Sequence, residues 1–342
     1  MKEIALGTIG SGFIVDRILD AVERTEGVFL AAVYSRSLQK GRALADRHGG
    51  AGIPVYTSLE EMLQDPQVNT VYVASPNTLH YDHCRMALEH GKHVICEKPF
   101  CPDGEQVRAL LKLAEEKELF LVDATPTAFL PNFEILKSKV SAVGRIRLVL
   151  CNYSQYSSRY DQLKAYLGQD LSGKAAPLPN VFNPAFAGGS LMDINYYNIY
   201  FMVSLFGKPG KVIYYPNLCE SGVDTSGIVV LIYPDFVCQG SGAKDTWGVN
   251  SAQIEGEQGY IHVADGSNGI ADVKLVTKEG TQSWNLQTEE IPGESNRWYY
   301  EIRNLVKMML ADDRERSYAQ TKTAADVMDV ICEAREQAGL SF

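Results

Sequence analysis

The sequence lacks the features that tie small secreted proteins together or anchor proteins in membranes. Its 342 residues contain seven cysteines, an odd number without a Cys-x-x-Cys pair. This pattern argues against a disulfide framework and favours reduced thiols, so we expect a cytoplasmic protein. Glycines interrupt the apolar run near the N-terminus, and the longest later run, 228–233, is far short of the roughly 20 residues that a membrane span needs.

The sequence also lacks an excess of positive charge. It has 32 Lys and Arg against 42 Asp and Glu, which gives a formal net charge of -10. No basic region is available to bind a phosphate backbone, and this argues against nucleic acid as a partner. With 45% hydrophobic residues the composition is that of an ordinary globular protein, and the length predicts two domains of roughly 100 to 200 residues each.

Between residues 3 and 123, short β-branched apolar runs alternate with amphipathic stretches of helical periodicity. Ser58 with Glu61 is typical of a helix capping box, and Gly91 of a helix C-terminus. Such an alternation predicts a first domain, residues 1–124, with a doubly wound parallel sheet covered by helices on both faces. The predicted strands are 3–9, 28–34, 71–74, 93–96 and 119–122, and the predicted helices are 13–25, 38–48, 59–63, 79–90 and 104–117.

The pattern changes after residue 124, and residues 125–342 predict an α+β domain with an open, mainly antiparallel sheet. Most of its strands are separated only by turns, which is typical of antiparallel neighbours. The run 228–233 is apolar on both faces, so a helix of the same chain or the sheet of a partner subunit should cover it. The predicted strands are 145–156, 211–215, 226–233, 236–240, 252–254, 260–263 and 272–276, the predicted helices are 191–205, 298–310 and 321–338, and residues 168–186 form a predicted surface loop.

A glycine turn follows the first predicted strand, where Gly10, Gly12, Phe13 and Ile14 lie just before the first helix. Glycines allow a tight turn and a close approach to a pyrophosphate, and the helix N-terminus offers free N–H groups to it. Because the turn opens a strand-helix-strand unit, it predicts a dinucleotide-binding Rossmann domain. Val15 occupies the place of the third small residue, which implies slightly looser packing of the helix on the strand.

The end of the second strand favours NADP over NAD. Rossmann domains that bind NAD usually carry an acid there, but this chain has Ser35 and Arg36, with Lys40 one turn further on. A carboxylate would repel a 2′-phosphate, whereas these groups attract one. The alternative reading is that Arg36 and Lys40 simply form a solvated helix start, and NAD remains possible.

Two further loops follow strands of the same sheet and should face the cofactor crevice. In doubly wound folds, ligands bind beyond the carboxyl ends of the strands. A lysine in such a crevice is costly unless it is paired or used in chemistry, and Glu97 is the obvious partner of Lys98. The loop residues concerned are Ser75, Pro76, Asn77, His80, Glu97 and Lys98.

The long helix of the second domain begins with Gly188 and Gly189 and carries Asp193 and Tyr197, four residues apart and therefore on one helical face. The plainer explanation is that its tyrosines belong to the core and that Asp193 complements the helix dipole.

Taken in order and spacing, these motifs resemble the Gfo/Idh/MocA family of NAD(P)-dependent oxidoreductases, over nearly the whole chain. They are Gly10-Ser-Gly12, Ser75-Pro-Asn77-Thr-Leu-His80, Glu97-Lys98-Pro99 and Gly189-Ser-Leu-Met-Asp193-Ile-Asn-Tyr-Tyr197. The resemblance implies that Lys98, Asp193 and Tyr197 form the catalytic group, and that the open sheet makes a homodimer or higher homo-oligomer. Tyr197, where many members have His, is similar to the branch of glucose-fructose oxidoreductase and dimeric dihydrodiol dehydrogenase, which uses NADP. Asn195 stands where Gly is frequent in the family.

Hydride transfer to or from a carbon that bears oxygen requires a proton to move at that oxygen. Tyrosine and lysine have reference pKa values near 10 and 10.4, so neither suits neutral pH unless its neighbours shift it. An ammonium beside the hydroxyl of Tyr197 would favour tyrosinate. We therefore predict Tyr197 as acid and base, Lys98 as its electrostatic partner and Asp193 as the group that holds them, while the reverse assignment, with Lys98 carrying the proton, stays open.

Other kinds of site and function also have some support in the sequence. His80, His83 and Cys84 have a spacing that could suit zinc, but they lie on a predicted Rossmann helix, and we predict no metal site. The favoured function is an NADP-dependent dehydrogenase or reductase of a sugar, polyol or dihydrodiol. The alternatives are an NAD-assisted glycosidase, which returns its cofactor unchanged, and a non-catalytic nucleotide or sugar sensor of the same fold.

Overall fold

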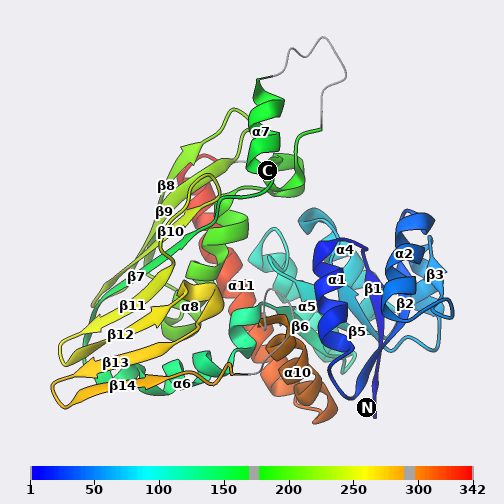
Figure 1. Cartoon of the computed structure of the whole chain (residues 1–342), viewed down its shortest axis with the longest axis horizontal. Helices are drawn as coiled ribbons and strands as arrows, with labels where there is room; N and C mark the ends of the chain where they lie inside the picture. Colours follow the sequence, from blue (N-terminus) through cyan, green and yellow to red (C-terminus); the bar gives the residue numbers. More distant parts are fainter. Residues whose placement is uncertain (1, 169–176, 289–296, 341–342) are drawn as a thin grey trace. The chain divides into compact units, whose positions relative to one another are not determined.

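The computed structural model describes residues 2–168, 177–288 and 297–340, and the chain forms two compact units (Figure 1). The first unit comprises residues 1–129 and 289–325, and the second comprises residues 130–288 and 326–342. Residues 289–325 thus return to the first unit, whereas the sequence division placed all of 125–342 in a second domain. As a functional boundary, residue 124 stays a prediction.

The first unit contains a six-stranded parallel sheet in the order β3-β2-β1-β4-β5-β6. The strand order reverses between β1 and β4, which is where ligands bind in doubly wound folds. β1 and β4 are buried along their whole length, as strands covered on both faces are. The strands are β1 (Ile4–Ile9), β2 (Val28–Tyr34), β3 (Val55–Tyr56), β4 (Thr70–Val73), β5 (His93–Glu97) and β6 (Leu121–Ala124).

Three helices of this unit start at side-chain caps. The side chains of Ser37, Ser58 and Asp103 each accept a hydrogen bond from a main-chain N–H of the first turn that follows. Ser58 accepts from the N–H of Glu61 at 3.3 Å, which confirms the predicted helix start. The helices are α1 (Phe13–Val22), α2 (Leu38–His48), α3 (Leu59–Gln64), α4 (His80–Glu89), α5 (Gly104–Glu116) and α10 (Arg297–Leu310).

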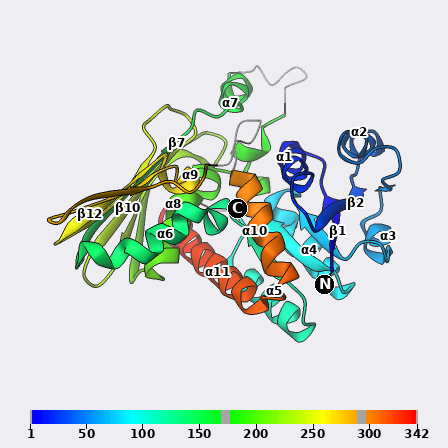
Figure 2. The same cartoon turned by 60° about the horizontal axis from the view of Figure 1, so that its bottom comes forward.

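Two helices from the C-terminal part of the chain complete the first unit. α10 packs beside α1, and the rings of Trp298 and Phe13 meet edge to face at 6.4 Å between centroids (Figure 2). The first part of α11 (Arg314–Gln337) lies on the sheet, because the hydroxyls of Ser317 and Thr321 donate to the carbonyl of Leu121 at 2.8 and 2.6 Å. These contacts explain why α10 and the first part of α11 belong with the Rossmann sheet.

The second unit contains an eight-stranded sheet in the order β14-β13-β12-β11-β7-β10-β9-β8. Its neighbouring strands are antiparallel except for β7 and β10, which run parallel. A mainly antiparallel open sheet is therefore confirmed. The strands are β7 (Ile146–Ser154), β8 (Lys211–Leu218), β9 (Asp224–Ile232), β10 (Val237–Ala243), β11 (Ser251–Gly256), β12 (Gly259–Ala264), β13 (Val273–Thr277) and β14 (Gly280–Trp284).

One face of this sheet is covered by helices of the unit, including α6 (Pro131–Lys139) and α8 (Tyr196–Phe206) (Figure 2). β9 shows the two faces clearly: Val229 and Leu231 are fully buried, whereas the side chain of Ile228 on the other face is 42% exposed. Large apolar side chains of β7 and β10 share that outer face, among them Leu148 and Val237. The apolar run thus has a helix cover on its inner face and an open outer face.

Some elements have no clear sequence signal. α6 and α7 (Tyr160–Leu167) are short, and β14 is a largely exposed strand without apolar alternation. α11 begins at Arg314, seven positions before the predicted residue 321, because its first two turns are polar. Of the predicted loop at 168–186, residues 169–176 lie outside the described residues, and the rest contains short 3-10 turns at Asn180–Phe182 and Pro184–Phe186.

Candidate active site

The glycine turn after β1 has the shape that a pyrophosphate needs. Gly10 has a φ of +123°, and a Cβ added there would lie 2.7 Å from the carbonyl oxygen of Ala74. Only glycine fits this position without strain. Gly12 precedes α1, and a Cβ added there would meet nothing within 4 Å. Packing within the protein therefore does not require a glycine at position 12, and the open space above it, at the N-terminus of α1, suits a pyrophosphate.

The two residues after Gly12 lie on the first turn of α1. The side chain of Phe13 is 59% exposed, and the guanidinium of Arg17 lies over its ring at 5.0 Å from the centroid. Ile14 is half-buried. The first turn thus presents an apolar surface next to the open space above Gly12.

The end of β2 adds hydroxyl groups to the glycine turn. Ser35 is buried, and its Oγ lies 3.0 Å from the Oγ of Ser11, a residue within the turn that sequence reasoning did not select. Ser35 Oγ also accepts a hydrogen bond from the N–H of Ser37, which caps α2. The structure therefore joins the glycine turn to the segment that was predicted to select the cofactor. Arg36 is exposed just beyond it.

His83 is a second residue that the sequence did not single out as a cofactor residue. Its Nδ1 lies 2.9 Å from the Oγ of Ser75, and its ring meets that of Tyr34 edge to face. Burial lowers the pKa of His83, and the positive charge of Arg36 lowers it further, while Asp82 raises it. The imidazole thus lies between the ends of β2 and β4, close enough to Arg36 to feel its charge.

Lys40 lies on the first turn of α2, where its main-chain N–H donates to Ser37 Oγ and its side chain is exposed. Asn77 begins the 3-10 turn η1 (Asn77–Leu79), and Pro76 comes directly before it. The predicted cofactor residues of β1, β2 and β4 therefore lie at the carboxyl ends of adjacent strands of one sheet.

His80 joins the loops after β4 and β5. It is 1% exposed, its Nε2 lies 2.8 Å from the carbonyl oxygen of Ser75, and its Nδ1 lies 3.0 Å from that of Pro99. Pro99 follows Lys98 through a cis peptide bond. With both ring nitrogens directed at main-chain carbonyls, His80 holds together the two loops that were predicted to bind the cofactor, and its two nitrogens are not available to a metal.

The carboxylate of Glu97 accepts hydrogen bonds from a side chain and from the main chain. Its Oε1 accepts from the hydroxyl of Tyr72 at 2.8 Å, and its Oε2 accepts from the main-chain N–H of Lys98 at 3.2 Å. The same tyrosine hydroxyl lies 3.4 Å from Oε1 of Glu301 on α10, and nearby Asp123 is fully buried. Burial and the charge of Glu97 raise the pKa of Asp123 to about 8, against a smaller opposite effect of the Thr125 hydroxyl. Lys98 therefore follows a buried acidic region.

In the second unit, a buried carboxylate fixes the segment that carries Asp193. A Cβ at Gly189, whose φ is +116°, would lie 2.3 Å from Oδ1 of Asp224. Oδ2 of Asp224 accepts from the N–H of Leu191 and from the hydroxyl of Tyr214, both at 2.7 Å. Because position 189 is a glycine, the main chain can pack closely against the carboxylate of Asp224 on β9. This carboxylate caps the helix start, since Ser190 at the N-cap position forms no capping side-chain bond.

The turn that follows is a π-helix, η6 (Leu191–Asn195), which continues directly into α8. π-turns are rare and often mark functional sites. This is a difference from the regular helix that the sequence predicted. Asp193 lies within it, half-exposed, and Tyr197 lies on the first turn of α8, 5% exposed.

Two partners of these residues emerge only from the structure. The Nζ of Lys244, which directly follows β10, bonds to Oδ2 of Asp193. The ring of Tyr153, on β7, meets that of Tyr197 edge to face at 5.7 Å. The sequence gives only a weak signal for the contact between Lys244 and Asp193, namely a lysine at the end of a strand of small residues.

Asn195 points into the sheet. Its Nδ2 donates to the carbonyl of Gly240 at 3.1 Å, and its Oδ1 accepts from Asn198 at 2.9 Å. Side chains added at Gly240 or Gly242 would collide with Asn195. The departure from the family pattern is therefore a packing feature between η6 and β10.

An aromatic platform lies in the same unit, formed by Tyr156, Tyr160 and Trp247. The rings of Tyr156 and Trp247 stack at 5.8 Å with an interplanar angle of 8°, and the ring of Tyr160 meets Tyr156 edge to face. Trp247 is 80% exposed, and the ammonium of Lys164 lies over the rings of both tyrosines. Trp247 follows Lys244 by three residues, so the platform is connected to the Asp193 region through a short loop.

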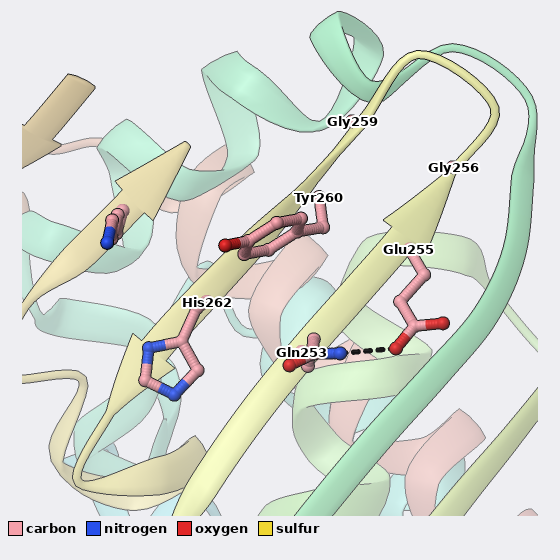
Figure 3. Close-up of a pocket in the computed structure, with 7 residues that line it drawn as sticks. Gln253, Glu255, Gly256, Gly259, Tyr260 and His262 are labelled. Carbon is pink, nitrogen blue, oxygen red and sulfur yellow. Dashed lines mark hydrogen bonds between the residues drawn. The ribbon is translucent and has the colours of Figure 1, made fainter. Parts of the chain in front are cut away.

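A surface hollow of about 540 Å³ lies elsewhere, on β11, β12 and β13 (Figure 3). Figure 3 shows Tyr260 and His262 beside Gln253 and Glu255 on one face of the strands. These side chains alternate with the buried Ala252 and Ile254, so the hollow lies on the outer face of the sheet, away from η6. None of the predicted site residues lines it.

Lys98 belongs to the first unit, and Asp193 and Tyr197 belong to the second. That the three residues act in one active site stays a prediction. Among the described residues, no group of three or more His, Cys, Asp and Glu could hold a metal ion. All seven cysteines lie in the described parts of the chain, and none of them forms a disulfide. No helix in those parts is long and apolar enough to cross a membrane.

Comparison with known proteins agrees with this architecture. A family model described as an oxidoreductase family with an NAD-binding Rossmann fold matches residues 4–123. The chain is 33% identical to scyllo-inositol 2-dehydrogenase (NADP(+)) IolU of Bacillus subtilis, over 99% of this chain and 98% of that protein. It is 28% identical to trans-1,2-dihydrobenzene-1,2-diol dehydrogenase of Sus scrofa, over 99% of this chain and 96% of that protein.

Solved structures share the fold of the whole chain. Levoglucosan dehydrogenase in complex with NADH and levoglucosan has a TM-score of 0.81 at 19% identity, and the match covers 99% of this chain and 98% of that one. A 3-ketoreductase from Actinomadura kijaniata in complex with NADP and TDP-benzene has a TM-score of 0.78 at 20% identity, and the match covers 98% of both chains. At these identities the likeness establishes the fold alone.

Proposed function

This chain belongs to the Gfo/Idh/MocA family of NAD(P)-dependent oxidoreductases, and we propose that it is an NADP-dependent dehydrogenase or reductase of a sugar, polyol or dihydrodiol. The observation that carries the cofactor part is the turn after β1, where Gly12 leaves open space at the N-terminus of α1. The neighbouring end of β2 carries two hydroxyl groups and a positive charge, from Ser11, Ser35 and Arg36. No acidic residue stands at that strand end.

The residues present fit a dinucleotide phosphate. The N-terminus of α1 and the main chain at Gly10 and Gly12 would hold the pyrophosphate, and Arg36 with Ser35 would hold a 2′-phosphate. When bound, the nicotinamide supplies or accepts the hydride. His83 would shape the pocket beside Arg36, since it lies between the ends of β2 and β4.

The side chains of the protein must transfer the proton to or from the substrate oxygen. We propose that the Tyr197 hydroxyl donates or accepts it, that the Lys98 ammonium favours the charged form of that oxygen, and that Asp193 orients the group. Glu97 supports this arrangement by holding the main-chain N–H of Lys98. The reverse assignment, with Lys98 as the proton carrier, predicts that a Tyr197→Phe variant keeps its turnover.

The relatives favour a substrate with vicinal hydroxyl groups. One acts on scyllo-inositol and another on a dihydrobenzene diol. Exposed aromatic side chains stack well against the apolar face of a cyclic substrate. The platform of Tyr156 and Trp247 contains such an exposed ring, that of Trp247.

The test is a screen of cyclitols, sugars and trans-dihydrodiols with NADP and NAD, following the reduced nicotinamide. Net formation of NADPH in step with the product supports a dehydrogenase. An NAD-assisted glycosidase would release sugar without net change in cofactor, and a sensor would bind NADPH without turnover. Either result would contradict the proposal.

We also propose that the outer face of the second sheet joins two copies of the chain. The exposed apolar side chains of Leu148, Ile228 and Val237 support this, because an uncovered apolar sheet face is costly in water. The seven cysteines form no disulfide in the described parts of the chain, which supports the predicted cytoplasmic location.

A further inference from the structure

The imidazole of His83 is half-buried between the ends of β2 and β4. Its Nδ1 lies 2.9 Å from the Oγ of Ser75, and its ring meets that of Tyr34 edge to face, with 6.5 Å between the centroids. The carbonyl of Tyr34 in turn accepts from the N–H of Gly10 at 3.1 Å. These contacts connect the histidine to the glycine turn through the end of β2, which is where a Rossmann domain binds the adenosine ribose of its cofactor.

A second basic group lies beside this imidazole. Arg36 follows Tyr34 by two residues and is exposed. Burial lowers the pKa of His83, the positive charge of Arg36 lowers it further, and the nearby Asp82 opposes both effects. Within the described part of the chain, neither the guanidinium of Arg36 nor the Nε2 of His83 forms a hydrogen bond or an ion pair. Two basic groups therefore lie close together, and no anion of the protein is bonded to either.

A bound phosphate would reverse the electrostatic effect on the histidine. Two neighbouring basic groups disfavour each other's charged form, whereas a nearby anion favours it. A phosphate has three oxygens that accept charge-assisted hydrogen bonds, and Arg36 with Ser35 supplies only some of the donors. Because Nδ1 of His83 is bonded to Ser75, Nε2 is the nitrogen that can contact a ligand.

We propose that His83 is a second ligand of the 2′-phosphate of NADPH, and that its imidazole takes up a proton from solvent when this cofactor binds. Neutral imidazole becomes imidazolium, in which Nδ1–H donates to Ser75 and Nε2–H donates to a phosphate oxygen. The inference rests on the proposed function for the place of the phosphate beside Arg36. NADH carries a hydroxyl in place of this phosphate, so it should bind without the proton.

Two titratable groups of α4 also lie near His83. His80 is 1% exposed, and its two ring nitrogens are bonded to main-chain carbonyls. Asp82 is exposed, and its carboxylate lies 3.9 Å from the guanidinium of Arg85. Neither group is directed at the end of β2 by these contacts, so the proton is assigned to His83.

The test is isothermal titration calorimetry of the whole chain with NADPH and with NADH, without substrate. Each titration is run at pH 7 in two buffers of different ionisation enthalpy, because the difference in binding enthalpy gives the number of protons taken up. A phosphate monoester has its second pKa near 6 and is mostly a dianion at this pH, so the cofactor itself contributes little. The wild type should take up about half a proton or more with NADPH and none with NADH.

Three variants separate the charge of the histidine from its packing. His83→Gln should abolish the uptake and raise the dissociation constant of NADPH about tenfold, while that of NADH is unchanged. His83→Arg carries a permanent charge, so it should keep the affinity for NADPH but take up no proton, which a purely structural role does not predict. His90→Gln is the matched control, since His90 follows the same helix and bonds to the carbonyl of Met86, and it should keep the uptake.

The wild-type titrations alone can overturn the proposal, even where a variant does not fold. No proton uptake with NADPH, or equal uptake with NADH, would do so, and so would an unchanged uptake in His83→Gln. If NADPH binds more tightly than NADH but without a proton, this inference fails and the proposed preference for NADP stands. If NADPH binds no more tightly than NADH, the proposed preference itself is contradicted.

Discussion

At the residue scale, the candidate site depends on a few side chains whose surroundings differ sharply. A glycine is required at position 10 by its positive φ and by the nearby carbonyl of Ala74, whereas a side chain at position 12 would meet no other part of the protein. Arg36 is exposed beside the buried Ser35.

Replacing Arg36 with Ala should weaken NADPH binding much more than NADH binding. An arginine-phosphate contact is charge-assisted, and a loss of about 1.5 to 3 kcal/mol corresponds to roughly a 10- to 150-fold rise in the dissociation constant of NADPH. Fluorescence titration with both cofactors measures it. The control is Arg42→Ala, further along α2, where the guanidinium of Arg42 bonds to Asp46. Equal losses for NADPH and NADH would refute the 2′-phosphate contact.

Replacing Tyr197 with Phe should leave the dissociation constant of NADPH unchanged and lower turnover by roughly 10² to 10⁴, as is typical for a general acid or base. Tyr196→Phe is the matched control, since its ring meets that of Tyr197 edge to face but it is given no part in the reaction. Steady-state kinetics decides between Tyr197 and Lys98: full turnover in Tyr197→Phe would assign the proton to Lys98.

At the scale of elements, the sequence predicts best where periodicity and capping act together. Five of the six strands of the first sheet and the helix start at Ser58 follow from local patterns and are confirmed, with β6 two residues later than predicted. The two-residue strand β3 was not predicted, because it is too short to show an apolar run. The π-turn at Asp193 does not, because it depends on a carboxylate from β9, 31 residues further on. The contact between Lys244 and Asp193 is missed for the same reason, since it joins segments distant in the chain.

The buried Asp123 on β6 should make the stability of the protein depend on pH. Its pKa is raised from 3.8 to about 8, so the folded state holds a proton that the unfolded state has lost between these values. The resulting stabilisation is full below about pH 4 and disappears as the pH rises through about 8, at about 1.4 kcal/mol per pH unit.

Urea unfolding between pH 5 and pH 9 tests this prediction. The unfolding free energy of the wild type should fall with rising pH relative to that of Asp123→Asn, which has no proton to lose. Asp46→Asn, whose carboxylate is exposed on α2, is the control and should follow the wild type. If wild type and Asp123→Asn show the same slope, Asp123 is ionised in the folded state throughout.

At the scale of the whole molecule, the sequence indicates two folds but not how the chain is shared between them. Residues 297–310 read as one more amphipathic helix, and contacts with distant parts of the chain, such as Trp298 on Phe13 and Glu301 beside Tyr72, assign them to the first unit. The apolar run on β9 predicted a second cover for its sheet, and the structure leaves the outer face around Ile228 exposed. A second copy of the chain is the cover that we propose for this face.

The outer face of the second sheet should hold the dimer together. We expect sedimentation to give twice the mass of one chain, and an Ile228→Asp, Val237→Asp variant to sediment as a monomer, because two charges would be buried without partners. Val249→Asp is the control, since Val249 is 83% exposed but lies in the loop after β10. A monomeric wild type, or a dimer that survives the double substitution, would place the interface elsewhere or exclude it.

The most direct test of the central claim is the stoichiometry of hydride transfer. Purified protein is given NADP and a panel of cyclitols, sugars and trans-dihydrodiols, and the reduced nicotinamide and the oxidised product are measured together. The account predicts that at least one substrate yields one NADPH per product, faster than with NAD, and that Tyr197→Phe loses this turnover while still binding NADPH. Product formation without net NADPH, or tight NADPH binding with no product from any substrate, would contradict it.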